Sequence, residues 1–313
     1  MNSRVTAFVL LSAAVAGLPA SRIGAQEQLP TFRSMANGVA VDVTVRDSKR
    51  KSVVGLKPAD FEVYDNGVRQ EVAEISYGKL PIDVTVALDV SFSVTGVMLE
   101  RLRSGVVTLM RDLAREDRLR LILFNSRVAR VVDFTTDENK VEAAIKAAAA
   151  GGGTALFDSI SVALVTPAPR ERRQLVVVFT DGNDSTSTTQ PTTLTNVALR
   201  TRAAVTMVLP GTGPVVVTGS GGSQQVITNM KVSLVPQPYD GFFQSLAKAT
   251  GGSVVRTDAS SNLNAVFRQI LEEFRSAYVL LYDAKGVESG YHELEVKVKR
   301  DGVIVSARRG YWN

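Results

Sequence analysis

The 313-residue sequence contains no cysteine and a single histidine, His292. Without cysteine, neither a disulfide framework nor a thiol nucleophile is possible. His292 falls in a strand pattern near the C-terminal end, so we expect a structural residue at the surface or half buried. No histidine or cysteine is therefore placed to serve as a nucleophile or its base.

The chain also lacks a strong excess of one charge and a long apolar run. The formal net charge of +5 falls to +3 when Arg4 and Arg22 are set aside, because the first 25 residues contain no acid. No run of lysine and arginine is interleaved with aromatic residues, and we therefore expect no nucleic-acid partner. The hydrophobic content of 45% is normal for a globular protein with a core.

The N-terminal segment 1–25 has the layout of a secretory signal peptide. Arg4 precedes an apolar stretch from about Ala7 to Leu18, and small residues follow at Ala20 and Ala25. The apolar part is shorter than the span of about 20 residues that crosses a membrane. We expect cleavage after Ala25, or else after Ala20, and an exported periplasmic or extracellular protein without a transmembrane segment. An uncleaved amphipathic anchor is the alternative, and without cysteine a lipoprotein anchor is excluded.

The two end segments, 31–80 and 276–313, both have the period of β-strands. In the first, valines alternate with other residues, and Asp65-Asn66-Gly67 predicts a hairpin turn. In the second, Asp301-Gly302 predicts another. We expect both segments to form one β-sandwich, with separate small sheets as the alternative. The expected strands after the first valine-rich one are Val53–Leu56, Phe61–Tyr64, Val68–Ile75, Ser276–Tyr282, His292–Lys299 and Val303–Ala307.

Between them, residues 81–275 alternate strand and helix patterns, which predicts an α/β domain with a doubly wound, mostly parallel sheet flanked by helices. Within it, 211–237 is expected to form a hairpin insertion. The expected strands are Ile82–Asp89, Arg118–Phe124, Val128–Phe134, Leu175–Phe179, Thr206–Pro210 and Ser253–Arg256. The expected helices are Val94–Leu113, Glu138–Ala149, the segment from Thr154 to about Val165, Phe242–Ala249 and Asn262–Phe274.

Polar oxygen side chains follow two of these strands and one glycine run. Asp89, Ser91 and Ser93 end the apolar run that starts at Ile82, and Asp181 ends a second apolar run. Thr154 follows Gly151-Gly152-Gly153, at a place where its hydroxyl can cap a helix as well as serve a metal. Oxygen ligands of this kind suit Mg²⁺, which needs about six of them and keeps several waters.

This ordered set resembles the metal-ion-dependent adhesion site of von Willebrand factor A domains. The family's first loop has the form Asp-x-Ser-x-Ser, its second supplies a Thr, and its third supplies an Asp after a strand; all five positions match. The resemblance implies that Ser91 and Ser93 bind the metal directly, Thr154 directly or through water, and Asp89 and Asp181 mainly through water. Mg²⁺ is the expected ion, with Mn²⁺ or Ca²⁺ possible. The valine-rich start and the ending Ala307–Tyr311 are also similar to secreted bacterial proteins with a VWFA-related domain.

The resemblance implies a protein-binding module for adhesion or complex assembly, in which an acidic residue of a protein partner completes the metal coordination. A structural envelope scaffold with a non-essential metal site is one alternative. A Mg²⁺-dependent hydrolase of the haloacid-dehalogenase kind is another, but it needs a second carboxylate where Ser91 stands. We therefore expect a protein that is not an enzyme. Asp158 is expected to stabilise a helix start or support the site, and Asp184 to lie in a polar rim, 182–189.

Overall fold

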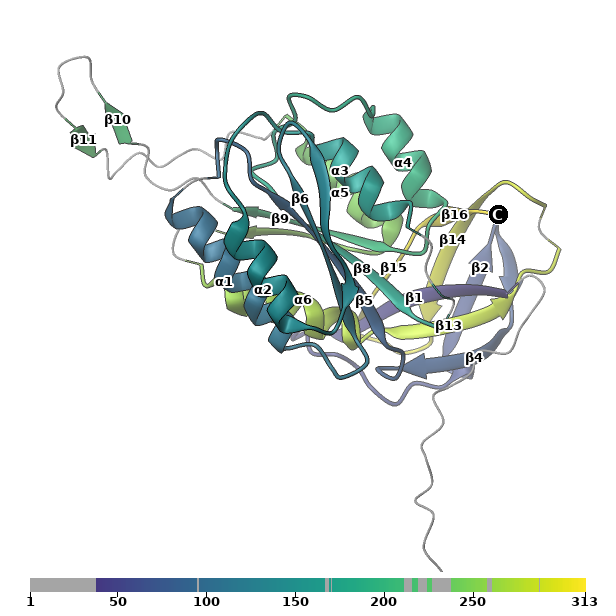
Figure 1. Cartoon of the computed structure of the whole chain (residues 1–313). Helices are drawn as coiled ribbons and strands as arrows, with labels where there is room; N and C mark the ends of the chain where they lie inside the picture. Colours follow the sequence, from purple (N-terminus) through teal and green to yellow (C-terminus); the bar gives the residue numbers. More distant parts are fainter. Residues whose placement is uncertain are drawn as a thin grey trace, which may run out of the picture.

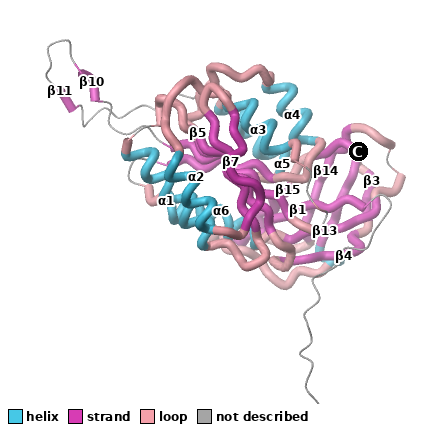
Figure 2. Tube along the Cα trace, viewed as in Figure 1, coloured by secondary structure: helices cyan, strands magenta, loops and turns pink. Residues whose placement is uncertain are grey.

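The computed structural model describes residues 38–94, 96–166, 169, 171–210, 216–218, 224–226, 238–257, 261–286 and 288–313. They form an α/β domain built on a six-stranded sheet and, beside it, two four-stranded antiparallel sheets (Figures 1 and 2). The expected signal peptide lies outside the described residues. Among the residues that are described, no helix is long and apolar enough to cross a membrane.

The sheet of the α/β domain has the strand order β12-β9-β8-β5-β6-β7. Its strands are parallel except for β7, which runs antiparallel to β6 at one edge. Every residue of β5 and β8 is buried, which explains why these two strands have nearly continuous apolar sequences. The strands are β5 (Ile82–Asp89), β6 (Arg118–Phe124), β7 (Val128–Thr135), β8 (Arg173–Phe179), β9 (Ala204–Pro210) and β12 (Val254–Thr257).

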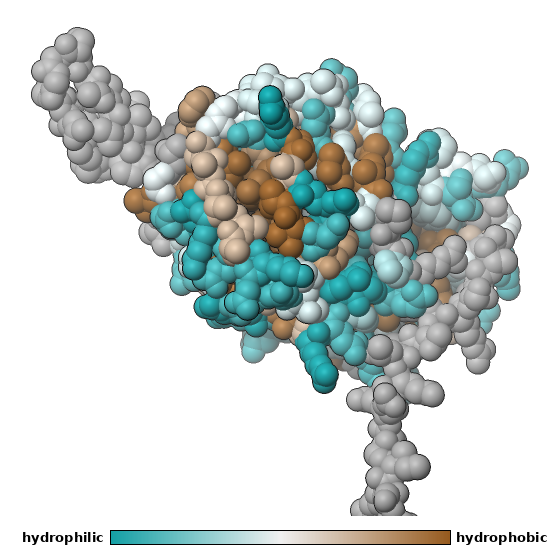
Figure 3. Space-filling view, in the orientation of Figure 1, coloured by the Kyte–Doolittle hydropathy of each residue, from teal (hydrophilic) through white to brown (hydrophobic). Residues whose placement is uncertain are grey.

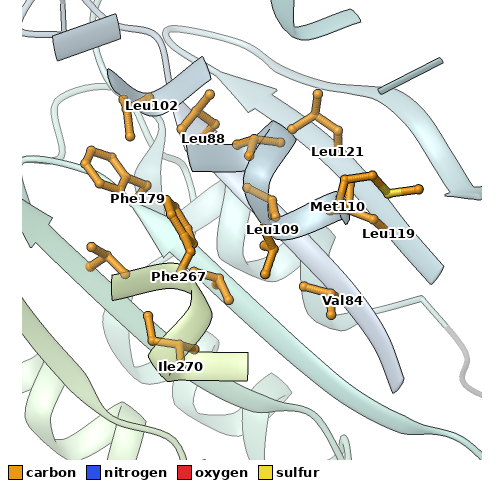
Figure 4. Close-up of a cluster of buried hydrophobic side chains, with 14 of the residues drawn as sticks. Val84, Leu88, Leu102, Leu109, Met110, Leu119, Leu121, Phe179, Phe267 and Ile270 are labelled. Carbon is orange, nitrogen blue, oxygen red and sulfur yellow. The ribbon is translucent and has the colours of Figure 1, made fainter. Parts of the chain in front are cut away.

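Three helices cover each face of this sheet (Figure 1). One face carries α1 (Val97–Arg111), α2 (Glu138–Ala147) and α6 (Leu263–Arg275), and the other carries α3 (Leu156–Leu164), α4 (Pro191–Leu199) and α5 (Asp240–Thr250). Figure 4 shows Leu102 and Leu109 of α1 packed with Leu88 of β5 and Phe267 of α6. The prediction of a doubly wound α/β domain is confirmed.

Both end segments contribute to both sheets of a β-sandwich. In one sheet, β1 lies between β13 and β15, and in the other, β2 lies between β14 and β3. Side chains of the two sheets share one hydrophobic core, so the expected shared sandwich is confirmed. The domain boundaries themselves stay predictions. The strands are β1 (Gly38–Asp47), β2 (Phe61–Asp65), β3 (Val68–Gln70), β4 (Val72–Tyr77), β13 (Tyr278–Asp283), β14 (Tyr291–Val298), β15 (Val303–Ala307) and β16 (Gly310–Trp312).

Some details of the sandwich differ from the prediction. Val53–Leu56 is not a strand. The Val53 amide donates to the Val45 carbonyl of β1 (2.9 Å), but beyond it the backbone bonds to a side chain: the Tyr278 hydroxyl donates to the Val53 carbonyl (2.9 Å) and accepts from the Leu56 amide (3.1 Å). A short 3₁₀ helix, Pro58–Asp60, follows. The expected strand Val68–Ile75 is divided at Glu71, since β3 pairs with β2 in one sheet and β4 pairs with β13 in the other.

The turn at Asp301-Gly302 does not join two strands of one sheet. It carries the chain from β14 in one sheet to β15 in the opposite sheet, so the expected hairpin is wrong. The hairpin at Asn66-Gly67 is confirmed, and both residues have positive φ (48° and 77°). Of the expected hairpin insertion, only β10 (Val216–Thr218) and β11 (Gln224–Val226) are described, and they pair antiparallel.

The prediction for His292 is also wrong, because its side chain is completely buried between the sheets. Its Nδ1 lies 2.7 Å from Asp65 Oδ1, and the hydroxyls of Tyr282 and Tyr311 each donate to Asp65 Oδ2 at 2.8 Å. A polar side chain costs less to bury when it has such partners. Burial and the hydrogen bond to Asp65 together raise the pKa of Tyr282.

The surface of the α/β domain is mostly polar over its helices. Figure 3 shows a hydrophobic area on the face where the edge strand β7 lies. Val131 of β7 is among the large hydrophobic side chains that the structure exposes. Edge strands that carry charged side chains resist pairing with another chain, and β7 also carries the exposed Arg130 and Asp133.

Candidate functional site

The candidate site lies at the carboxyl ends of β5 and β8. These strands are parallel neighbours, with Leu88 paired to Phe179, so the loops that begin at Asp89 and Thr180 leave the sheet side by side. Ligands of open α/β sheets bind at this edge. The glycine run before Thr154 reaches the same edge, because the Gly151 amide donates to the Val90 carbonyl (2.8 Å).

The first loop turns around the buried carboxylate of Asp89. Its Oδ1 accepts from the Ser91 amide (2.8 Å) and its Oδ2 accepts from the Thr180 hydroxyl (2.7 Å), which ties the first loop to the third. Ser91 is buried, Ser93 is exposed, and their hydroxyl oxygens are 3.0 Å apart. Both serine hydroxyls therefore point to one place at the surface.

The surroundings of Asp89 disfavour its negative charge when no cation is bound. Burial raises the pKa of Asp89, hydrogen bonds from Ser91 and Thr180 oppose that rise, and the nearby negative charge of Asp181 adds to it. Raising the pKa means that the folded protein disfavours the ionised form. A bound cation would remove this penalty, because it offsets the charge of both carboxylates.

The second loop approaches closely because it is made of glycine. The Phe92 amide donates to the Gly152 carbonyl (3.1 Å), and a Cβ on Gly152, whose φ is 82°, would lie 2.9 Å from the Ser126 hydroxyl. A Cβ on Gly153 would lie equally close to the Ser185 hydroxyl, at 2.9 Å. Only glycine fits such contacts without a shift of the neighbours.

Thr154 follows, largely buried, and is tied by its backbone to the third loop. Its amide donates to the Ser185 hydroxyl (2.9 Å), and its carbonyl accepts from the amides of Ser185 (2.9 Å) and Thr186 (3.1 Å). Asp181 is at the start of the same third loop, where its Oδ1 accepts from the Asn183 amide (3.0 Å). All five residues predicted for the site thus lie on three loops that are hydrogen-bonded to one another.

The helix cap expected from Thr154 is wrong, because Asp184 has that role. Helix α3 begins at Leu156 without a side-chain cap from its own N-cap residue. Instead Asp184 Oδ1 accepts from the amides of Leu156 (2.8 Å) and Phe157 (3.3 Å). Sequence patterns missed this contact because the donor and acceptor are 28 residues apart.

Asp158 holds the same loop from the other side. Its carboxylate accepts from the amides of Thr188 (3.0 Å) and Thr189 (2.8 Å). Partial burial raises the pKa of Asp158, but the hydrogen bonds from Thr189 and Thr188 outweigh it, and the pKa lies below its ordinary value. Asp158 is therefore a support of the rim segment 182–189.

The donor set fits a hard divalent cation. Two ligand oxygens at right angles, each roughly 2.0–2.1 Å from an octahedral ion, lie about 2.9 Å apart, close to the 3.0 Å between the Ser91 and Ser93 hydroxyls. Within the described residues, no three His, Cys, Asp or Glu side chains form a cluster, so a zinc-type site has no support there. The hydroxyl and carboxylate oxygens suit Mg²⁺, Mn²⁺ or Ca²⁺.

Comparison with known proteins identifies a family for the part of the chain that carries these loops. Residues 84–183 match the family model of the von Willebrand factor type A domain, and this range includes all five site residues. Among solved structures, BatB from Bacteroides thetaiotaomicron is 21% identical, with 62% of this chain and 98% of that chain covered and a TM-score of 0.47. An aerotolerance-related membrane protein from Bacteroides fragilis is 20% identical over the same shares, with a TM-score of 0.47. A von Willebrand factor type A protein from Catenulispora acidiphila is 11% identical, covers 90% of this chain and 76% of that chain, and has a TM-score of 0.49.

Proposed function

Because the chain contains a von Willebrand factor type A domain, we propose that it is an exported protein-binding module whose divalent cation is completed by a carboxylate of its partner. The observation that carries the proposal is the pair of serine hydroxyls, 3.0 Å apart, above the buried Asp89. Thr154 and Asp181 lie on the two loops that are hydrogen-bonded to the loop of these serines. Three direct hydroxyl ligands and two waters held by Asp89 and Asp181 would leave one of the six positions of an octahedral ion for an incoming ligand.

The chemistry of the donors explains why a carboxylate would be that ligand. Ser91, Ser93 and Thr154 are neutral, so direct coordination by them leaves most of the positive charge of the ion unquenched. Asp89 and Asp181 act mainly through water and compensate that charge from a distance. An Asp or Glu of a protein partner is the natural group to occupy the remaining position. The partner would thus be bound through the metal without any chemical reaction.

A hydrolase is less well supported by the same residues. The position where such an enzyme needs a second carboxylate carries Ser91, and the only histidine of the chain is buried in the sandwich. An envelope scaffold with a non-essential metal site remains the second candidate. The tight hydrogen bonding of the three loops is compatible with a scaffold, and the binding experiment below distinguishes a scaffold from a binding module.

Export is part of the proposal and rests on the segment 1–25. We expect the mature protein to begin near Gln26, in the periplasm or outside the cell. N-terminal sequencing of the protein purified from the envelope or the culture medium tests this. A protein that retains Met1 and stays with the cytoplasm would contradict the export proposal.

The metal is tested by calorimetric unfolding of the mature protein with and without Mg²⁺. Binding adds about 2.7 kcal/mol to the free energy of unfolding when the ion is at a hundredfold excess over its dissociation constant. Asp89→Ala and Asp181→Ala should abolish this gain. Ser93→Ala should reduce it with little effect on the apo protein, because Ser93 is exposed. Ser245→Ala, which removes another exposed serine hydroxyl on α5, is the matched control. Equal gains in all variants would refute the site.

Binding is tested by capture of proteins from an envelope extract. A partner should be retained with Mg²⁺ or Mn²⁺, released by EDTA, and lost with Thr154→Ala. Removal of an exposed charge on α1, for example Arg111→Ala, should have little effect, because it lies at the far end of that helix. A partner that is indifferent to EDTA and to Thr154→Ala would favour the scaffold.

A further inference from the structure

A large aromatic side chain stands exposed between the two serines of the site. Phe92 is 74% exposed, whereas the hydrophobic residues on either side of the loop, Val90 and Val94, are buried. Its backbone is fixed by the hydrogen bond to Gly152, and its ring passes over Gly151, where a Cβ would lie 3.8 Å from the ring. The ring therefore lies against the glycine run, on the loop that carries the two serines.

A second hydrophobic side chain is exposed on the same loop. Val97 is 77% exposed and is the first residue of α1, reached through Gly96 at a positive φ of 55°. Neither Phe92 nor Val97 belongs to a hydrophobic core of the domain. Both side chains are therefore exposed to contact with a ligand rather than used to fill a core. Exposed apolar side chains next to a polar site are typical of a binding surface.

We infer that the partner segment carries a hydrophobic side chain close to its metal-binding carboxylate, and that this side chain packs on Phe92 and Val97. The inference rests on the proposed function and specifies its ligand. Phe92 is adjacent in sequence to both Ser91 and Ser93, so the ring is within one side-chain length of the coordinated group. An extended peptide advances about 3.3 Å per residue, which places the hydrophobic residue one or two positions from the Asp or Glu.

The charges around the ring favour such a peptide. The carboxylates of Asp158 and Asp184 are engaged by backbone amides of the surrounding loop and of α3. The cation supplies the attraction for the acid, and the aromatic ring supplies the contact for its apolar neighbour. The ligand is thus an acidic and hydrophobic peptide segment of a protein.

The test is selection of a displayed random heptapeptide library on the mature protein in Mg²⁺, with elution by EDTA. Wild-type protein should enrich an Asp or Glu with an aliphatic or aromatic residue within two positions. The same selection on Phe92→Ala should keep the acidic residue and lose the hydrophobic preference. A synthetic wild-type-selected peptide should bind Phe92→Ala about tenfold more weakly, the loss expected for burying one ring less completely. Val97→Ala should show a smaller loss of the same kind.

The control is Val54→Ala, in the sandwich, which removes a side chain that is 62% exposed and far from the site in sequence. It should bind the peptide like wild type. Acidic peptides without a hydrophobic neighbour, or equal affinity of Phe92→Ala and wild type, would overturn the inference while leaving the proposed function intact. No enrichment of acidic peptides in Mg²⁺ would overturn both. If wild-type protein cosediments with lipid vesicles in the absence of peptide, and Phe92→Ala but not Val54→Ala fails to do so, the ring binds a lipid surface instead.

Discussion

Arg173 joins the α/β domain to the sandwich, and its replacement by methionine tests how strongly the two are coupled. The side chain begins β8, is 2% exposed, and donates from Nε to Asp42 of β1. Its guanidinium carbon lies 3.9 Å from the centre of the Phe274 ring at the end of α6. Methionine keeps the apolar stem of the side chain and removes the charge and its donors.

The expected loss follows from these contacts. A hydrogen bond between charged groups contributes about 1.5–3 kcal/mol, and a desolvated cation–π contact contributes about 2 kcal/mol. Against this, one buried nitrogen of Arg173 has no hydrogen-bond partner among the described residues, and its removal returns about 1–3 kcal/mol. Asp42 is 26% exposed, so water partly solvates the carboxylate that is left behind. Arg173→Met should therefore lower the free energy of unfolding by about 0.5–4 kcal/mol.

Urea unfolding measures this loss with two probes that report on different parts of the chain. Trp312, the only tryptophan, lies in β16 and reports on the sandwich by fluorescence. Circular dichroism reports on the helices, and the described α-helices all lie between residues 97 and 275. Both transitions should shift together in Arg173→Met, because the contact joins both parts.

Two comparisons make the result specific. Arg268→Met breaks a surface ion pair with Asp112 and should cost much less than Arg173→Met, because Arg268 is 52% exposed and water screens the pair. Combined with Asp42→Asn, Arg173→Met should cost less than the sum of the two single changes. If Arg173→Met is no worse than Arg268→Met, or if the two probes separate in wild type, the coupling argument is wrong.

Further predictions concern packing, topology and pH. Gly105→Ala should destabilise in urea, because a Cβ there lies 2.7 Å from Phe267, and overpacking of about 1–3 kcal/mol exceeds the helix-propensity gain of about 1 kcal/mol; a more stable variant would contradict this. Deletion of 276–313 should make 38–77 protease-sensitive, because β1 loses both neighbours, and persistent resistance would contradict the shared sandwich. The pKa of Asp158 is lowered, so its stabilisation is present above its ordinary pKa near 4 and lost as pH falls through the folded value. The stability difference between wild type and Asp158→Asn should then be constant at neutral pH and shrink in acid.

The fold was predictable where burial dictates the sequence pattern. β5 and β8 are buried on both faces and consist almost entirely of apolar residues, and the apolar side chains of α1 and α6 recur at helical spacing. For the sandwich, the sequence predicted most of the strands but not the sheet to which each strand belongs. The chain crosses from one sheet to the other at Glu71, and no turn residue in Val68–Ile75 marks the crossing. Only the partner strands, from the other end of the chain, decide to which sheet each half belongs.

The sequence was sufficient to predict that the five candidate residues lie on neighbouring loops, but not how those loops are held, and metal binding by the five stays a prediction. Asp89, Ser91, Ser93, Thr154 and Asp181 belong to sequence patterns that are local to each loop. Asp184, in contrast, caps a helix that begins 28 residues earlier, and no local pattern records that contact. The same holds for His292, which is buried because Asp65, 227 positions away, supplies its hydrogen bond.

This division between the candidate residues and the contacts that hold their loops has a functional meaning. The hydrogen bonds that hold the three loops together use backbone amides and carbonyls, the hydroxyls of Thr180 and Ser185, and the carboxylates of Asp89, Asp158 and Asp184. Thr154 is held through its own amide and carbonyl, which leaves the position of its hydroxyl set by the loop. The loops therefore keep their shape without a demand on the hydroxyls proposed to bind the cation. Hydroxyl oxygens that the loops already hold in place lose little conformational entropy when a cation binds. Because these oxygens are neutral, a cation bound to them would keep most of its charge and would still attract a carboxylate of a partner.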